Sequence, residues 1–202
     1  MVDRDFNQPA FYYDSRFGRE ATKILPGQYY VTQEDKLIVT VLGSCVAACI
    51  FDPITEIGGM NHFMLPSNKS VCKNASHAHR YGIHAMEVLI NDCLRLGAER
   101  KRLVAKVFGG AKVLPGFVQN DIGATNTTFV LDFLKTENIP ILSSDLMKTY
   151  ARKVYFTPSD GSVLMKRIRT VNNSTITERE AELAMRINVD AQASGSIDLF
   201  DD

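Results

Sequence analysis

The chain has 202 residues and a mass of 22.5 kDa, which suits one domain that buries its own hydrophobic core. Hydrophobic residues make up 45% and charged residues 23%, proportions typical of a globular protein and not of a disordered one. Twenty-three basic residues balance twenty-three acidic ones, so the chain lacks the cationic excess of proteins that coat nucleic acid. It also lacks an apolar run of the roughly 18 residues that span a bilayer, and its N-terminus does not read as a signal peptide. We therefore expect a cytoplasmic protein without membrane insertion, whose four cysteines are free thiols.

The first 25 residues carry aromatic side chains among charges, without a sustained helix or strand period. We expect residues 1–25 to form an irregular N-terminal arm and residues 26–202 to form a single domain. The dipeptide Pro26-Gly27 marks a turn between the two parts.

Several short runs predict strands in the first third of the domain. Residues 28–32 and 37–42 are rich in Tyr, Val, Ile and Thr, the residues that strands favour. The apolar run 46–51 fits a buried strand or a helical turn, because periodicity does not separate the two over so few residues. An extended pattern resumes at residues 60–65, and a polar surface loop is expected over residues 67–79.

Two segments have helical periodicity. From Tyr81 onward, apolar residues recur three or four positions apart, and Gly97 stands where a C-terminal cap belongs. Residues 127–137 place Phe129, Val130 and further apolar residues on one face, which predicts a second helix that stops near Asn138.

The remaining predicted strands cover residues 103–108, 139–142, 153–157 and 163–168, the last two joined as a hairpin by a turn that contains Gly161. Strands outnumber helices and cluster early in the chain, so we expect an α+β fold and not a regular βαβ series. In the tail, residues 178–186 form a charged helical stretch, most simply a solvated helix face.

The densest candidate for chemistry is Cys45 with His62. The Gly43-Ser44 turn after a predicted strand can raise Cys45 at the strand's end, and a helix starting there would favour the thiolate further. His62 lies in a strand-like run that fixes its direction, as a base beside a nucleophile requires. Thr40, on the strand that leads to the turn, can orient the imidazole.

A structural interpretation stays open beside this one. Free cysteine is among the most buried residue types, and a lone histidine in a strand is more often a satisfied core residue. Cys49 and Cys93 are read as packing residues in the same way.

Two further motifs carry weaker signals. Cys72, His77, His79 and His84 could ligate a metal, but their spacing lacks the paired cysteines of a zinc site, so a solvated loop is the simpler interpretation. Gly109-Gly110 follows a predicted strand without a phosphate-loop pattern, and we expect it to let the backbone pass close to the active site.

The sequence resembles the CheD family of chemoreceptor glutamine deamidases. The likeness is carried by Thr40-Val-Leu-Gly-Ser-Cys-Val-Ala-Ala-Cys49 and Gly58-Gly-Met-Asn-His-Phe-Met-Leu-Pro66, and it continues in Ala105-Lys-Val-Phe-Gly-Gly-Ala111 and Arg152-Lys-Val-Tyr-Phe156. It extends over nearly the whole chain, from about Tyr12 to Phe200.

The resemblance implies Cys45 as the nucleophile, His62 as the base and Thr40 as the third member. Gly43, Ser44 and Asn61 are further candidates for holding the substrate or the oxyanion. No metal or cofactor has a role in the implied chemistry, which hydrolyses a receptor glutamine to glutamate through a Cys45 thioester.

The implied fold has mixed β-sheets in a sandwich-like core with helices packed outside. The implied partners are the cytoplasmic helices of methyl-accepting chemotaxis receptors, and in some members a phosphatase of the CheC type. The alternative function is a non-catalytic chemotaxis adaptor that binds receptors or a CheC-type phosphatase.

One departure from the family stands out at Asp145. Many relatives carry Gly-Gly after this aspartate, whereas this chain continues Leu146-Met147-Lys148. Paired glycines commonly mark unusual backbone angles or a close backbone approach, so we expect a differently shaped loop here.

Overall fold

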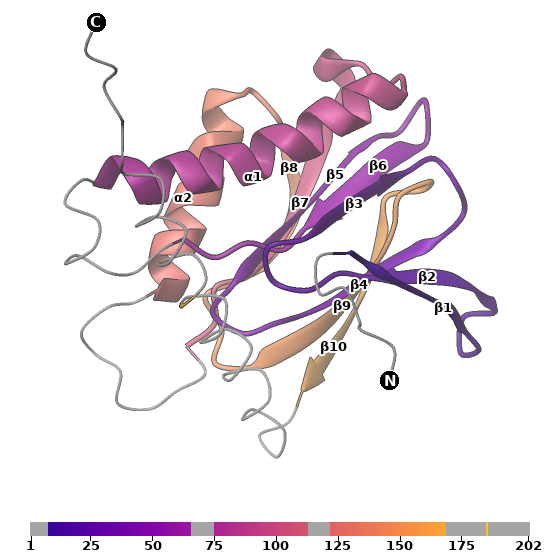
Figure 1. The fold of residues 1–202 in the computed structure, drawn as a ribbon, viewed down its shortest axis with the longest axis horizontal. Helices are drawn as coiled ribbons and strands as arrows, with labels where there is room; N and C mark the ends of the chain where they lie inside the picture. Colours follow the sequence, from indigo (N-terminus) through magenta and orange to yellow (C-terminus); the bar gives the residue numbers. More distant parts are fainter. Residues whose placement is uncertain (1–7, 66–74, 113–121, 169–184, 186–202) are drawn as a thin grey trace, which may run out of the picture.

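The computed structural model describes residues 8–65, 75–112 and 122–168 together with residue 185, and the side chains of residues 75–79 are not part of that description. Within the three long described ranges, ten strands form two five-stranded sheets, accompanied by two α-helices and one short 3-10 helix (Figure 1). The helices are α1 (Ala75–Leu96), α2 (Ile122–Thr136) and η1 (Arg100–Arg102). The strands are β1 (Ala10–Asp14), β2 (Arg19–Lys23), β3 (Tyr29–Thr32), β4 (Leu37–Leu42), β5 (Val46–Asp52), β6 (Ile57–Asn61), β7 (Val104–Gly109), β8 (Ile141–Leu146), β9 (Ala151–Thr157) and β10 (Ser162–Ile168).

The two sheets are mixed and face each other. The first has the strand order β1-β2-β4-β9-β10 and the second β3-β6-β5-β7-β8, with one parallel pair in each, β2 with β4 and β7 with β8. Helices α1 and α2 cover the outer face of the second sheet (Figure 1). This arrangement confirms the α+β class and the sandwich-like core with helices outside.

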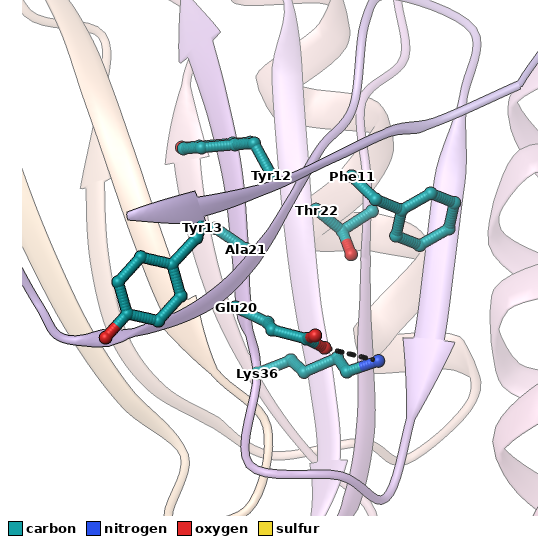
Figure 2. Close-up of a pocket in the computed structure, with 7 residues that line it drawn as sticks. All are labelled: Phe11, Tyr12, Tyr13, Glu20, Ala21, Thr22 and Lys36. Atoms are coloured by element: carbon teal, nitrogen blue, oxygen red, sulfur yellow. Dashed lines mark ion pairs between the residues drawn. The ribbon is translucent and has the colours of Figure 1, made fainter. Parts of the chain in front are cut away.

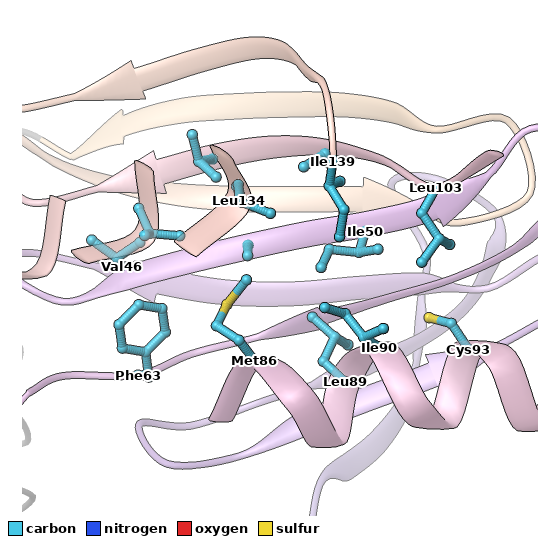
Figure 3. Close-up of a cluster of buried hydrophobic side chains, with 14 of the residues drawn as sticks. Val46, Ile50, Phe63, Met86, Leu89, Ile90, Cys93, Leu103, Leu134 and Ile139 are labelled. Atoms are coloured by element: carbon cyan, nitrogen blue, oxygen red, sulfur yellow. The ribbon is translucent and has the colours of Figure 1, made fainter. Parts of the chain in front are cut away.

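Two hydrophobic clusters hold these three layers together. One lies between the second sheet and the helices, where Met86, Leu89 and Ile90 of α1 face Ile50 of β5 (Figure 3). The other lies between the sheets and includes Cys45 and further side chains of β4, β5 and β9. Because side chains alternate along β5, successive residues enter the two clusters in turn. None of the helices in the described ranges is long and apolar enough to span a bilayer.

The expectation of an irregular arm is wrong for residues 10–23. These residues form the antiparallel hairpin β1–β2, and β2 pairs in parallel with β4 through Lys23 and Val39. Phe11 and Tyr13 are 63% and 66% exposed, so β1 lacks the in-out alternation that identifies a strand in sequence. The domain boundary drawn at residue 26 stays a prediction.

Both predicted helices are present, with earlier starts. Helix α1 begins at Ala75, so the end of the expected loop over residues 67–79 is helical, and it stops before Gly97, which has φ +116° as a cap requires. Helix α2 begins five residues before the predicted start and is followed by Asn138 in a left-handed conformation, φ +56°. Buried residues on one face of each helix explain the periodicity.

The structure decides the ambiguous run after Cys45. Residues Val46–Asp52 form the strand β5, and all seven are buried. No helix starts there, so helix amides do not favour a Cys45 thiolate in the way considered from the sequence. The β9–β10 hairpin is confirmed, whereas the charged stretch 178–186 lies outside the described residues apart from Met185.

Candidate active site

Cys45 directly precedes β5 and His62 directly follows β6, two neighbouring strands of the second sheet. Val46 and Phe63 form an antiparallel bridge and exchange both backbone hydrogen bonds, at 3.0 and 2.9 Å. In this register Ala47 lies opposite His62. Cys45 stands two residues before Ala47, and because side chains alternate along a strand, the two side chains lie on the same face. Cys45 and His62 are therefore diagonal neighbours, a relation in which α-carbons lie about 7–8 Å apart and long side chains can meet.

Thr40 orients the imidazole from the opposite sheet. Its Oγ1 lies 2.8 Å from His62 Nδ1, and the same hydroxyl donates to the carbonyl oxygen of Ile24 at 2.9 Å. A hydroxyl has one hydrogen, so it accepts at Nδ1, and the Nδ1 atom carries the proton. The basic lone pair of His62 is consequently on Nε2, an atom with no hydrogen-bond partner among the described residues.

Burial keeps this imidazole neutral. His62 is 2% exposed, and desolvation lowers its pKa to about 3. At neutral pH it is thus an unprotonated base, the form that accepts a proton from a thiol. Cys45 is 0% exposed, so its Sγ is closed to solvent in this structure.

The backbone of β7 closes against Cys45, as expected for Gly109-Gly110. The Gly110 amide donates to the Cys45 carbonyl oxygen at 2.8 Å, and the Ala111 amide donates to the carbonyl oxygen of Gly43, also at 2.8 Å. Gly109 has φ +119°, and a Cβ there would lie 2.1 Å from the Cys45 oxygen. Only glycine fits at this position, because any side chain would displace the Cys45 backbone.

The structure directs Asn61 away from Cys45. Its side chain leaves the strand on the helix side, where Oδ1 accepts from the Ala48 amide and Nδ2 donates to the Ala85 carbonyl oxygen, both at 2.9 Å. Asn61 therefore ties β5 and β6 to α1, and it is not brought to the thiol. Alternation along the strand carried this signal, since Asn61 and His62 are consecutive residues.

Sequence reasoning missed two buried polar residues beside the site. Asn126 of α2 is 0% exposed and hydrogen-bonds the Ser44 carbonyl oxygen through Nδ2 at 3.0 Å. Asn126 precedes Phe129 and Val130 by three and four residues, so its place on the buried helix face could have been noticed. Such a polar residue in an apolar stripe requires a partner.

Arg152 of β9 is the second such residue. It is fully buried, its Nη1 donates to the Gly109 carbonyl oxygen at 3.0 Å, and it forms an ion pair with Asp145 at 2.8 Å. Tyr150 donates to the same carboxylate at 2.8 Å. Arg152 thereby fixes the end of β7, whose glycines contact Cys45, to β8.

The segment after Asp145 contains a residue other than glycine in the left-handed conformation that glycine adopts most easily. Met147 has φ +59°, and its amide donates to the Gly109 carbonyl oxygen at 3.2 Å. An L-residue adopts this region at a cost, which glycine does not have.

Two surface pockets lie away from this cluster. One, of about 380 Å³, is formed by the β1–β2 hairpin and Lys36, where Lys36 pairs with Glu20 (Figure 2). The other, of about 560 Å³, lies between β3 and the end of α1 and is lined by Tyr29 and Asp92 among others. Neither is lined by Cys45, His62 or Thr40.

The weaker motif of Cys72, His77, His79 and His84 is not resolved as a group. Cys72 and the side chains of His77 and His79 lie outside the described residues, so this interpretation stays a prediction.

Comparison with known proteins gives a consistent assignment. The family model described as CheD chemotactic sensory transduction matches residues 64–167. Proteins with curated names match over more of the chain. The chain is 51% identical over 195 residues to the probable chemoreceptor glutamine deamidase CheD 1 of Shewanella oneidensis, covering 96% of this chain and 94% of that protein. It is 53% identical over 189 residues to the protein of that same name from Dechloromonas aromatica, covering 94% of this chain and 93% of that protein.

The family model begins two residues after His62, whereas the full-length relatives span the region of Cys45 as well. Identity of this level over nearly the entire length leaves one assignment: the chain belongs to the CheD family.

Proposed function

We propose that this protein hydrolyses side-chain amides of specific glutamines to glutamate on methyl-accepting chemotaxis receptors, with Cys45 as nucleophile, His62 as general base and Thr40 as its orienting partner. The names of the relatives, chemoreceptor glutamine deamidases, supply the reaction and substrate class. The observation that carries the residue roles is the Thr40–His62 hydrogen bond, which leaves Nε2 as the basic atom of the imidazole.

In the first half-reaction, His62 Nε2 takes the thiol proton while Cys45 Sγ attacks the glutamine carboxamide carbon. The C–S bond forms as the carbonyl π electrons move to oxygen, which gives a tetrahedral oxyanion. Backbone amides of the Gly43-Ser44 turn are our candidates for holding this oxyanion, since the turn adjoins the nucleophile in the chain. His62 then returns its proton to the nitrogen, the C–N bond breaks, and ammonia leaves a glutamyl thioester.

In the second half-reaction, water attacks the thioester and gives a proton to His62 Nε2. The C–S bond breaks, the proton returns to the sulfur, and glutamate and the free thiol are released. Every atom is supplied by the substrate, water, Cys45 and His62.

The burial of both side chains sets a requirement on this scheme. Sγ of Cys45 is 0% exposed, so a glutamine side chain reaches it only after a movement that uncovers the sulfur. Desolvation of His62 also disfavours a permanent thiolate–imidazolium pair in the free protein. We therefore expect the proton to move when substrate is in place and not beforehand.

The receptor's cytoplasmic helices are the proposed partner, and the bacterial cytoplasm is the proposed location. A CheC-type phosphatase remains a second proposed partner. The alternative function is an adaptor without turnover. Replacing Cys45 alone distinguishes it from an enzyme, because an adaptor still binds its partner after the thiol is removed.

The test incubates the protein with a receptor cytoplasmic fragment and records ammonia release and a one-dalton mass gain per modified glutamine. The wild-type protein should give both, and Cys45→Ala neither, with folding intact by circular dichroism. Cys49→Ala is the matched control, because Cys49 is equally buried four residues further along the chain, within β5, and burial raises the pKa of its thiol. Unchanged release by Cys45→Ala would remove Cys45 from the mechanism, and release equally lost in Cys49→Ala would reduce its role to packing.

A further inference from the structure

The side chain of Asn126 lies between two backbones that belong to the candidate active site. Its Nδ2 donates to the Ser44 carbonyl oxygen at 3.0 Å, and its Oδ1 accepts from the Leu65 amide at 2.8 Å. Ser44 immediately precedes Cys45, and Leu65 follows His62 by three residues. One carboxamide thus contacts the backbones that carry the nucleophile and the base.

The register of the sheet shows which backbone hydrogen bond this contact replaces. With Val46 opposite Phe63, continued pairing would set Ser44 opposite Leu65, two residues along each strand. Hydrogen-bonded pairs recur every second residue in an antiparallel ladder, so the Leu65 amide would then donate directly to the Ser44 oxygen. The Asn126 carboxamide occupies that position and supplies one donor and one acceptor in place of the direct bond.

The inserted carboxamide separates the two chain segments at Ser44 and Leu65, the pair directly next to Cys45. It also links this end of the sheet to α2, because Asn126 is completely buried in the helix, which packs on β5 and β7. At the same end of α2, Gly123 contacts Gly110 so closely that a Cβ on it would lie 2.6 Å from the Gly110 carbonyl oxygen. The position of the Cys45 backbone therefore depends on α2 through two contacts.

We infer that Asn126 is a positioning residue of the deamidase, which holds the Ser44–Cys45 turn at a fixed separation from the segment that follows His62. This inference rests on the proposed function. Nucleophilic attack needs the reacting atoms in a narrow range of geometry, and a misplacement of about 1 Å can lower the rate on the order of a hundredfold. The two hydrogen bonds of Asn126 end on backbone atoms of Ser44 and Leu65, so its effect passes through the backbone of the turn.

The test compares the full-length wild-type protein with Asn126→Ala and Val130→Ala. Val130 is equally buried one turn further along α2, where it packs in the cluster under the second sheet and bonds neither Ser44 nor Leu65. With a receptor cytoplasmic fragment as substrate, Asn126→Ala should lower kcat on the order of a hundredfold and leave KM unchanged. Val130→Ala should destabilise the protein and keep the wild-type kcat below its unfolding transition.

A second measurement does not depend on deamidation. Alkylation of Cys45 by iodoacetamide, followed by mass spectrometry of its peptide, reports how readily the buried sulfur becomes accessible. Asn126→Ala should raise this rate about tenfold, the factor for loss of one hydrogen bond of roughly 1.4 kcal/mol, and Val130→Ala should not. Should Asn126→Ala fail to fold, Asn126→Asp keeps the acceptor for Leu65 but sets an oxygen against the Ser44 carbonyl, and the same changes are expected.

The outcomes separate the two proposals. If the wild-type protein released no ammonia, the proposed function would be overturned. The alkylation rates would still test whether Asn126 holds the turn at Cys45. Wild-type activity together with an unchanged kcat in folded Asn126→Ala would overturn the positioning role. Equal losses of kcat in Asn126→Ala and Val130→Ala would overturn it as well, since any weakening of α2 would then suffice.

Discussion

Thr40 and His62 meet across the interface between the two sheets, with Thr40 Oγ1 2.8 Å from His62 Nδ1. Thr40 belongs to β4 of the first sheet, and His62 follows β6 of the second. The hydroxyl is anchored in turn by its bond to the Ile24 carbonyl oxygen. Packing of the sheets against each other is therefore what selects the tautomer and direction of the His62 imidazole.

Replacing Thr40 by valine should impair catalysis and stability together. Valine has the same shape but no hydroxyl, so the buried Nδ1–H and the Ile24 oxygen lose their partner at a cost of about 1–3 kcal/mol. The imidazole is also no longer held in one tautomer, and we expect kcat to fall on the order of a hundredfold. Ammonia release and urea unfolding measure the two effects.

Thr40→Ser is the control for this change, because serine keeps the hydroxyl and loses only a methyl group. Its kcat should stay near that of the wild type. A Thr40→Val variant as active as Thr40→Ser would show that orientation of His62 does not depend on this bond.

Acid should destabilise the protein through His62. The unfolded chain binds a proton at this residue near pH 6.5, whereas burial lowers the pKa in the folded state to about 3. Between these values the unfolded form holds more protons, so the free energy of unfolding decreases as the pH falls. The slope approaches 1.4 kcal/mol per pH unit for one proton and flattens below about pH 3.

His62→Asn isolates this contribution, because asparagine can still donate towards Thr40 but does not titrate. Urea unfolding at a series of pH values from 7 to about 4 should show the wild-type protein losing stability faster than the variant. Parallel curves for the two proteins would mean that the folded imidazole titrates normally, contrary to its burial.

Two neighbouring arginines in η1 should differ sharply in their contribution to stability. Arg102 pairs with Asp52, whose carboxylate is completely buried, through bonds of 3.0 and 2.8 Å, and these bonds hold the pKa of Asp52 far below its usual range. Arg102→Gln leaves that charge buried without its partner, at an expected cost of about 3 kcal/mol. Arg100 pairs with Glu137 at the surface, so Arg100→Gln should cost at most about 1 kcal/mol.

Urea unfolding of the two variants measures this difference at neutral pH. Asp52 is the last residue of β5, whereas Cys45 directly precedes its first residue, so the two lie at opposite ends of the strand. The deamidation rate of the folded variants should therefore be that of the wild type. Equal stability losses would contradict the assignment of Asp52–Arg102 as the buried pair.

Local patterns predicted most of the fold and pointed to Cys45, His62 and Thr40 as candidate site residues. Glycines marked the turn before Cys45 and the close passage of Gly109 beside it, because both positions impose backbone angles or spacing that other residues do not tolerate. Alternation along the strands predicted that His62 has a fixed direction. The opposite directions of Asn61 and His62 follow from the same rule, which sends Asn61 to the helix side of the sheet.

What the sequence did not reveal depends on contacts between distant segments. The strands β1 and β2 exist because β2 pairs with β4, and no local alternation marks them. Asn126 and Arg152 act on backbone oxygens more than 40 positions away in the chain, the separations being 82 for Ser44 and 43 for Gly109. Such partners follow only from the assembled sheets.

Met147 offers a test of strain at a left-handed position that is not occupied by glycine. Its φ of +59° crowds the Cβ of an L-residue, at a cost of roughly 1–2 kcal/mol that glycine avoids. Part of this gain is offset by the greater freedom of glycine in the unfolded chain. We expect Met147→Gly to be more stable than Met147→Ala by about 1 kcal/mol in urea unfolding. Both variants remove the half-exposed side chain and both keep the amide that donates to the Gly109 carbonyl oxygen, so the comparison isolates the Cβ. If alanine proved as stable as glycine here, the left-handed conformation of Met147 would carry no strain.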